Sequence, residues 1–207
     1  MEKKWANQAK CGNEIHNILQ MYFSETKHGG NKWSELLEGS QGSMHKNNLI
    51  KILRNSGKIT DVTTEEIIDQ TLEYAKSLKE EIERTYGDNV LYYPEFTLSA
   101  ELNKEYDGRN DLELLGRIDL LVIDKNGVPH VIDYKTSPKP FEKYSTAKQL
   151  NFTYQLATYE RMLRRWGFNT INTNIMVAPI VLDNFRNEGD KWIYDGIKQG
   201  TVESSKF

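Results

Sequence analysis

Two aspartates and a lysine lie in a stretch of sequence that has the pattern of a β-hairpin. The stretch covers residues 116–136, where two runs rich in Ile, Leu and Val are separated by a short turn-forming segment that ends at Gly127. In the register that a three-residue loop with a left-handed Gly127 imposes, Asp119 lies opposite Asp133. Paired residues share a face of a sheet, and side chains alternate along each strand. The pattern therefore predicts that Asp119, Asp133 and Lys135 project from one side of the sheet.

Two carboxylates placed opposite one another repel, and each resists ionising. A hard divalent cation such as Mg²⁺, Mn²⁺ or Ca²⁺ would relieve that repulsion, because these ions prefer carboxylate oxygens. The alternative is that Asp119 and Asp133 are solvated charges at strand ends, with Lys135 as a salt-bridge partner. Apolar residues on both faces favour burial, and buried charges without partners are costly. These neighbours are Ile118, Leu120, Leu121, Val122, Ile123, Val131 and Ile132.

A helix predicted over residues 4–23 carries a candidate ligand. Its apolar stripe recurs at spacings of three and four residues and includes His16. Gly12 lies one turn earlier, where glycine costs roughly 1 kcal/mol in a helix interior. A glycine there would make sense if another backbone or a ligand approached closely. The alternative is that His16 is an ordinary core histidine with satisfied ring nitrogens.

The remaining elements are predicted from periodicity and from capping residues. Thr63 and Glu66 have the spacing of a capping box, Ser145 can cap a later helix that Gly167 ends, and Pro94 indicates an edge strand or a bulge just before Glu95. The expected helices cover 33–37, 47–55, 63–86 and 145–166, and the expected strands outside the hairpin cover 90–102 and 171–182. This order predicts an α/β or α+β fold, with one sheet flanked by helices.

The helix predicted over 145–166 presents a polar and aromatic stripe. Lys148, Phe152, Gln155 and Tyr159 share one side, and residues four apart on a helix point the same way. We expect Gln155 and Tyr159 to serve a substrate more than the fold. Ordinary packing of Tyr159 against the sheet is the alternative.

Composition limits the class of protein. The chain has 207 residues, 38% hydrophobic and 28% charged, which fits one globular domain of ordinary make-up. A formal net charge of −3 does not indicate a nucleic-acid binder, but catalytic carboxylates lower such a count. The single cysteine, Cys11, excludes an internal disulfide and a four-cysteine zinc or iron–sulfur centre. With no membrane-spanning apolar run and no apolar signal-peptide core at the N-terminus, a cytoplasmic location is expected, and no ATP-binding loop is found.

Taken together, four short motifs resemble those of the PD-(D/E)XK nuclease superfamily, and within it the RecB-like branch. That branch includes the nuclease domains of bacterial recombination helicases and the CRISPR adaptation nucleases. The resemblance covers about residues 5–24 and 90–182, and this chain lacks the iron–sulfur cluster and the helicase motor of some relatives. The matching motifs are GNEIH at 12–16 for GxxxH, GRID at 116–119 for GxxD, DYK at 133–135 for (D/E)XK, and QLATY at 155–159 for QxxxY.

The resemblance implies a restriction-endonuclease-like core, with a mixed central sheet of about four to five strands flanked by helices. It implies a single nuclease domain over residues 1–207. Residues 25–89 would be a helical elaboration that varies within the family, and residues 183–207 a peripheral tail.

The resemblance also implies a Mg²⁺- or Mn²⁺-dependent DNA nuclease acting in recombination, repair or processing, with an exonuclease mode slightly favoured. Asp119 and Asp133 would bind one or two ions, His16 would complete the coordination, Glu95 is a further candidate ligand, and Lys135 would orient or help to deprotonate water. DNA, single- or double-stranded, is the expected partner, a helicase or recombination protein is another candidate, and no membrane is expected. The residues assigned to substrate are Gln155, Tyr159, Arg117 and Lys148. The alternatives are a catalytically inactive DNA-binding or scaffold subunit on the same fold, and a hydrolase of another phosphate ester.

Overall fold

The computed structural model describes residues 2–26, 31–101, 113–137, 143–188, 191–199 and 203–205. One sheet runs through the molecule in the order β1-β2-β3-β4-β5, and a short β6 also pairs with β4. All neighbouring strands are antiparallel except β3 and β4, which are parallel, so the sheet is mixed. The strands are β1 (Leu91–Glu101), β2 (Glu113–Ile123), β3 (Pro129–Ser137), β4 (Ile175–Glu188), β5 (Lys191–Gln199) and β6 (Glu203–Ser205).

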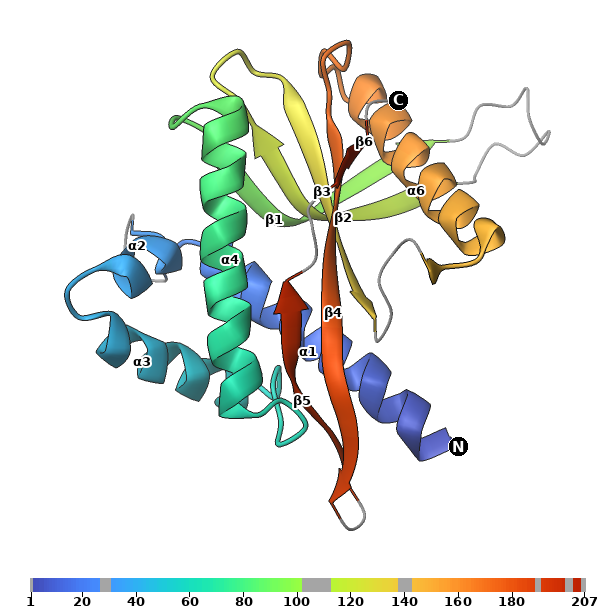
Figure 1. Ribbon diagram of the computed structural model, residues 1–207. Coiled ribbons are helices and arrows are strands. Elements are labelled where there is room, and N and C mark those ends of the chain that lie inside the picture. The colour runs from blue at the N-terminus through green and yellow to red at the C-terminus, as the bar shows by residue number, and fades with distance from the viewer. Residues whose placement is uncertain are drawn as a thin grey trace.

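Helices cover both faces of this sheet, which confirms the predicted mixed α/β fold (Figure 1). On one face, α1 and α4 pack against β2, β3 and β4 around residues such as Leu19, Leu78 and Leu120. On the other face, α6 forms a second core around Leu156 and Leu163. The helices are α1 (Glu2–Phe23), α2 (Trp33–Glu38), α3 (Gly42–Asn55), α4 (Glu65–Tyr86) and α6 (Thr146–Arg165).

The β2–β3 hairpin has the predicted register. Leu120 pairs with Ile132 and Ile123 with Pro129, and Gly127 adopts a left-handed conformation with φ 76°. The Asp124 carboxylate stabilises the loop by accepting hydrogen bonds from the backbone N–H groups of Asn126 and Val128. The loop therefore fixes the register, as its length and its glycine predict.

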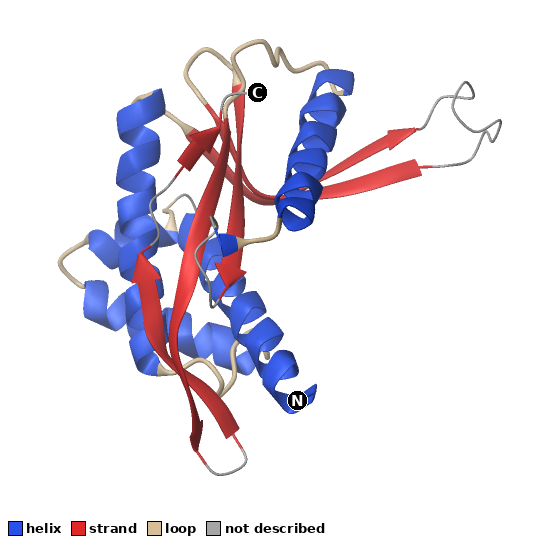
Figure 2. Ribbon diagram, turned by 45° about the vertical axis from the view of Figure 1, so that its right-hand side comes forward, coloured by secondary structure: helices blue, strands red, loops and turns tan. Residues whose placement is uncertain are grey.

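The regular alternation of side chains between the two faces of the sheet is interrupted at Glu95 on β1 and at Asp119 on β2. Before this point on β2, Ile118 belongs to the core under α6, and after it Leu120 belongs to the core under α1 and α4. Glu95 has φ 54°, a left-handed conformation that is uncommon for a residue with a side chain. The paired ends of both strands project beyond α6 in Figure 2. We call this interruption the bend of the sheet. It lies at two of the predicted site residues.

Two further helices, α2 and α3, pack on α1 and α4 on the side away from α6 (Figure 1). Their core contains Leu49 and Leu53 of α3 together with the α1 residue Ile18. Glu14 of α1 is buried, and its carboxylate accepts hydrogen bonds from the Thr60 N–H at 3.0 Å and the Thr60 hydroxyl at 2.7 Å. These bonds fasten the connection between α3 and α4 to the first helix.

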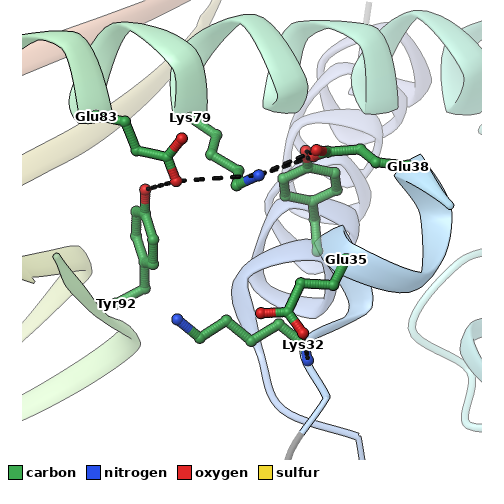
Figure 3. A network of polar contacts seen from close by, with 7 residues as sticks. Lys32, Glu35, Glu38, Lys79, Glu83 and Tyr92 are labelled. Carbon is green, nitrogen blue, oxygen red and sulfur yellow. Dashed lines mark hydrogen bonds and ion pairs between the residues drawn. The ribbon is translucent and has the colours of Figure 1, made fainter. Parts of the chain in front are cut away.

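A polar network joins α1, α2 and α4 to β1 (Figure 3). The Lys79 ammonium donates to both oxygens of Glu38, at 3.2 and 3.0 Å, and lies 3.9 Å from Glu83. The hydroxyl of Tyr22 also donates to Glu38, and that of Tyr92 donates to Glu83 at 3.2 Å. Each carboxylate in this network therefore has a hydrogen-bond donor.

Some element boundaries differ from those predicted. Thr64, not Thr63, is the N-cap of α4, and its hydroxyl accepts from the Ile67 N–H, while Glu66 contacts Gln70 instead of reaching back to the cap. With two adjacent threonines, the residue that keeps an extended backbone becomes the cap, and here that is Thr64. The helix at 47–55 begins earlier, at Gly42.

The C-terminal part of the sheet is larger than the sequence indicated. The strand expected at 171–182 is β4, which spans Ile175–Glu188, and β5 follows as an edge strand. Both strands include residues of 183–207, the segment that the resemblance implied to be a peripheral tail. By contrast, α6 matches its prediction closely. The Ser145 hydroxyl accepts from the Lys148 N–H, and Gly167 follows the helix with φ 91°.

Candidate active site

Three carboxylates lie at one level across three neighbouring strands. Glu95 of β1 lies opposite Asp119 of β2, between the pairs Pro94–Leu120 and Phe96–Ile118. Asp119 in turn occupies the position opposite Asp133, next to the last pair of the β2–β3 ladder. We call Glu95, Asp119 and Asp133 the carboxylate row. Counting the hairpin register predicted two of its members side by side, and the structure places the candidate ligand Glu95 next to them.

The Asp119 side chain makes a hydrogen bond to β3 where the β2 backbone does not. Its Oδ2 accepts a hydrogen bond from the Tyr134 backbone N–H at 2.8 Å, so the side chain satisfies a donor that the β2 backbone does not reach. Burial raises the pKa of the Asp119 carboxyl, although the Tyr134 N–H and the nearby Lys135 and Arg117 act in the opposite direction. The carboxylate is thereby fixed at the bend of the sheet.

Asp133 is the most deeply buried member of the row, at 2% exposure. In the described part of the chain, its Oδ2 accepts no hydrogen bond of normal geometry and instead contacts the Lys135 ammonium. Burial raises the pKa of the Asp133 carboxyl, Lys135 lowers it, and the neighbouring Asp119 raises it further. The predicted trio of Asp119, Asp133 and Lys135 is therefore brought together, with Lys135 as the counter-ion of Asp133.

His16 approaches the row from α1. Its Nδ1 lies 3.9 Å from Asp119 Oδ2, and its ring meets Tyr134 edge-on at 5.5 Å between centroids. Burial, together with the positive charge of Lys135, lowers the pKa of His16 to about 4. At neutral pH the imidazole is uncharged, so the contact with Asp119 is not an ion pair. A neutral imidazole is the form that binds metal ions.

Glu95 and Arg117 form an ion pair on the outer side of the row. Arg117 Nε lies 2.8 Å from Glu95 Oε2, and the Arg117 side chain is 70% exposed. Left-handed backbone at a residue such as Glu95 costs of order 1–3 kcal/mol and persists where the surroundings enforce it. The conformation aims Glu95 at Arg117 beside the row.

Tyr159 and Gln155 hold α6 to β2 next to Asp119. The Tyr159 hydroxyl donates to the Arg117 carbonyl at 2.7 Å and accepts from the Gln155 side-chain amide at 2.9 Å. The Tyr159 ring is nearly buried, so it packs on the sheet and its hydroxyl also braces the strand. A depression of about 430 Å³ opens here, lined by Gly116, Arg117, Asp119, Gln155, Tyr159 and Met162, among others.

The two motif glycines have different surroundings. A Cβ on Gly116 would lie 3.0 Å from the Tyr159 ring and 3.1 Å from Met162 Sδ, so α6 packs directly on this backbone. A Cβ on Gly12 would meet the Thr136 side chain at 3.4 Å, an ordinary contact. The close approach expected at Gly12 is therefore that of a side chain on β3, and the tighter approach occurs at Gly116.

Lys148 does not contact the carboxylate row directly. Its ammonium lies 4.0 Å above the Tyr144 ring and 5.9 Å from the centroid of Phe152. Phe152 itself lies under Lys135, with 4.8 Å between Nζ and the ring centroid. The sequence placed Phe152 on this helical stripe without assigning it to the site. The signal was present in its spacing of three and seven residues from Gln155 and Tyr159.

The chemistry of the row fits a divalent cation. Among the described residues, no group of three or more His, Cys, Asp or Glu side chains is arranged to hold an ion as it stands. A positive charge nevertheless already contacts Asp133, in the form of the Lys135 ammonium. Two carboxylates with raised pKa values and a neutral imidazole are donors that a hard cation would stabilise. The Lys135 ammonium would have to move away from Asp133 for such an ion to bind there.

The chain was compared with curated proteins and with solved structures. No curated protein matches the chain. Two solved structures resemble it weakly. One is SSO0001, at 12% identity and a TM-score of 0.35, and the match covers 98% of this chain and 82% of SSO0001. The other is an Eubacterium rectale protein provisionally named an exonuclease, at 11% identity and a TM-score of 0.36, and the match covers 97% of this chain and 77% of that protein. None of the described helices is long and apolar enough to cross a membrane.

The family model of the PD-(D/E)XK nuclease superfamily matches residues 2–191, which include the carboxylate row, Lys135, His16 and the Gln155–Tyr159 pair. The mixed sheet flanked by helices is consistent with the restriction-endonuclease-like fold of that superfamily. The chain belongs to the PD-(D/E)XK nuclease superfamily.

Proposed function

We propose that this nuclease hydrolyses phosphodiester bonds of DNA and that it depends on Mg²⁺ or Mn²⁺. Membership of the superfamily supports nuclease activity, and members generally use divalent metal ions. The observation that carries the proposal is the juxtaposition of buried Asp133 with Asp119 and Lys135 at the bend of the sheet. A protein with only a structural use for this bend would have little reason to bury facing carboxylates there.

Asp119 and Asp133 would hold the metal, with His16 and Glu95 as further ligands. A bound divalent cation lowers the pKa of a coordinated water and stabilises negative charge on the phosphate. The uncharged His16 can offer a ring nitrogen at neutral pH without first losing a proton. Asp119 is already oriented by the Tyr134 N–H. One carboxylate oxygen therefore has its direction fixed before any ligand arrives.

Lys135 would act on the water or on the phosphate oxygens. Its ammonium lies beside Asp133 and is little exposed, so it presents a positive charge within the site rather than to bulk solvent. A lysine ammonium in this position can orient the attacking water, favour loss of its proton by stabilising the resulting hydroxide, and offset charge on the phosphate.

The remaining assigned residues would serve the DNA strand. Arg117 is largely exposed beside the row, and Lys148 is exposed on α6, so both can reach backbone phosphates. Tyr159 holds the Arg117 backbone by donating to its carbonyl, and Gln155 donates in turn to the Tyr159 hydroxyl. Through that contact they would brace both Arg117 and the Asp119 two residues further on.

The broader assignments are part of this proposal. We propose one nuclease domain over residues 1–207, with residues 25–89 as a helical elaboration and 183–207 at the periphery. The protein would act on single- or double-stranded DNA in recombination, repair or processing, with an exonuclease mode slightly favoured. A helicase or recombination protein is the candidate partner.

A time course on end-labelled linear DNA and on circular DNA, each single- and double-stranded, tests the activity. Purified protein should degrade DNA with Mg²⁺ or Mn²⁺ and should not with EDTA, and circular substrates report the endonuclease mode. Lys135→Ala should slow cleavage by at least about a hundred-fold, since a group acting at the transition state is lost. Metal-dependent DNA binding without cleavage would favour the inactive scaffold. Cleavage by Lys135→Ala within a few-fold of wild type would show that the site is assigned wrongly.

A further inference from the structure

The Lys135 ammonium lies between a carboxylate and an aromatic ring. It contacts Asp133 Oδ2 and stands 4.8 Å from the ring centroid of Phe152 on α6. The Lys135 side chain is only 17% exposed, so these two neighbours form much of its surroundings. An ammonium at this distance from a ring face is attracted by the ring's quadrupole. Nothing in the proposed chemistry so far uses Phe152.

The same ring also lies near a second lysine and a second aromatic ring. Lys148, which is exposed, has its ammonium 5.9 Å from the Phe152 centroid and 4.0 Å from that of Tyr144. The Tyr144 and Phe152 rings are themselves 5.9 Å apart. Phe152 therefore lies among Tyr144 and two lysines, and of the two ammonium groups that of Lys135 is the closer to its ring.

We propose that Phe152 is a positioning residue for Lys135, an inference that rests on the proposed nuclease function. Lysine has a flexible four-carbon stem and loses considerable side-chain freedom when its ammonium is fixed. Asp133 alone attracts the ammonium toward the carboxylate, where it opposes a cation. The Phe152 ring supplies a second attraction of a different direction. Lys135 thereby keeps its charge within the site when Asp133 takes another partner.

The kinetic test compares Phe152→Leu with Phe152→Tyr on end-labelled DNA, with kcat and KM measured separately. Loss of the ring contact should lower kcat by roughly three- to thirty-fold in Phe152→Leu. KM should stay within about two-fold, and Phe152→Tyr should restore most of kcat. Tyr154→Leu removes an aromatic ring that is 68% exposed on the same helix, and it should behave as wild type.

Other roles for Phe152 give different results. If the ring only packs, both variants lose melting temperature and kcat per folded molecule is unchanged. If it stacks on a DNA base, KM rises in Phe152→Leu and kcat does not change. Either result overturns the inference.

A spectroscopic measurement keeps the inference testable even if wild-type protein does not cleave DNA, which would refute the proposed function itself. The ring current of Phe152 should shift the Lys135 Hε signals upfield in a ¹H–¹³C spectrum, where Lys135→Met identifies them. The shift should vanish in Phe152→Leu and persist in Phe152→Tyr. Signals that are unshifted in wild type, or that are unaffected by Phe152→Leu, would refute the contact.

Discussion

Two carboxylates, Asp133 in the sheet and Glu14 in α1, are almost equally buried but differ in their hydrogen-bond partners. They are 2% and 3% exposed. Glu14 receives a backbone N–H and a hydroxyl from Thr60, one on each oxygen. Asp133 Oδ2 has no hydrogen bond of normal geometry from the described residues and is balanced by the Lys135 ammonium.

The same contrast separates the two regions around them. In the polar network of Figure 3, Glu38 and Glu83 each accept from a tyrosine hydroxyl and lie against Lys79. In the carboxylate row, burial raises the pKa values of Asp119 and Asp133. Charges in the helical region are satisfied and should contribute to stability. Charges in the row are less well satisfied, which is expected where a ligand must bind.

Loss of His16 should have a larger effect than any change in the helical region. His16→Ala should raise the Mg²⁺ concentration for half-maximal cleavage by at least about ten-fold, because a candidate ligand is lost. Added Mn²⁺ should restore part of the rate. Metal titrations of cleavage at pH 7 measure this, where the low pKa of His16 removes proton competition. An unchanged metal requirement in a folded variant would make His16 an ordinary core residue.

The opposite result is expected in the helical region. Lys79→Met should lower the free energy of unfolding by about 1–2 kcal/mol, since Glu38 and Glu83 lose a partly exposed cation. Cleavage per folded molecule should stay at the wild-type level. Urea unfolding and a cleavage assay on the same preparation provide both values. A strong loss of activity without a loss of stability would place this network in the site.

Adding one methyl group at each of the two motif glycines should have opposite effects on stability. Gly116→Ala should destabilise by about 1–3 kcal/mol and slow cleavage, because the new Cβ would crowd Tyr159 and Met162 beside Asp119. Gly12→Ala should be neutral or stabilising by up to about 1 kcal/mol, since alanine favours helix and Thr136 leaves room. Thermal unfolding of both variants decides this. A larger loss from Gly12→Ala than from Gly116→Ala would contradict the packing described.

The smallest effect is a pH dependence of stability from a histidine outside the row. His130 stacks on Tyr86 at 3.8 Å, and its Nδ1 accepts the Asn174 N–H, which requires an unprotonated nitrogen. Burial lowers the pKa of His130, although Asp124 acts in the opposite direction. Because the unfolded chain takes up the proton more readily, this contribution is present above about pH 6.5 and declines as the pH falls below it.

Urea unfolding at pH 7 and pH 5 measures that dependence. The loss of stability between the two values should be smaller in His130→Asn than in wild type. Part of the loss should remain, because His16 also has a lowered pKa. An identical loss in the two proteins would show that His130 does not contribute.

Local patterns in the sequence predicted the parts of the site that depend on local structure. Loop length and Gly127 fix the hairpin register, so Asp119 and Asp133 could be placed opposite one another by counting. Residues four apart on a helix share a side, so Gln155 and Tyr159 could be paired. The α6 boundaries could be predicted because Ser145 caps the start of the helix and Gly167 follows its end, and both signals are local.

Features that depend on tertiary contacts were not predictable in this way. The left-handed backbone of Glu95 has no local signal such as glycine, and it arises where β1 and β2 change sides. The contact of Phe152 with Lys135 joins two elements whose relative placement the sequence does not specify. The edge strand β5 contains Asp195 and Gly196, which weaken the strand pattern, and it forms by pairing with β4.

The most direct test of the account measures Asp133→Asn and Glu14→Gln side by side, for unfolding by urea in EDTA and for cleavage with Mg²⁺. Asp133→Asn should be as stable as wild type or more stable, and should cleave at least about a hundred-fold more slowly. Glu14→Gln should lose about 1–3 kcal/mol of stability and cleave normally per folded molecule. If Asp133→Asn instead lost stability as Glu14→Gln does and still cleaved DNA, the carboxylate row would be a structural feature and the proposed site would be wrong.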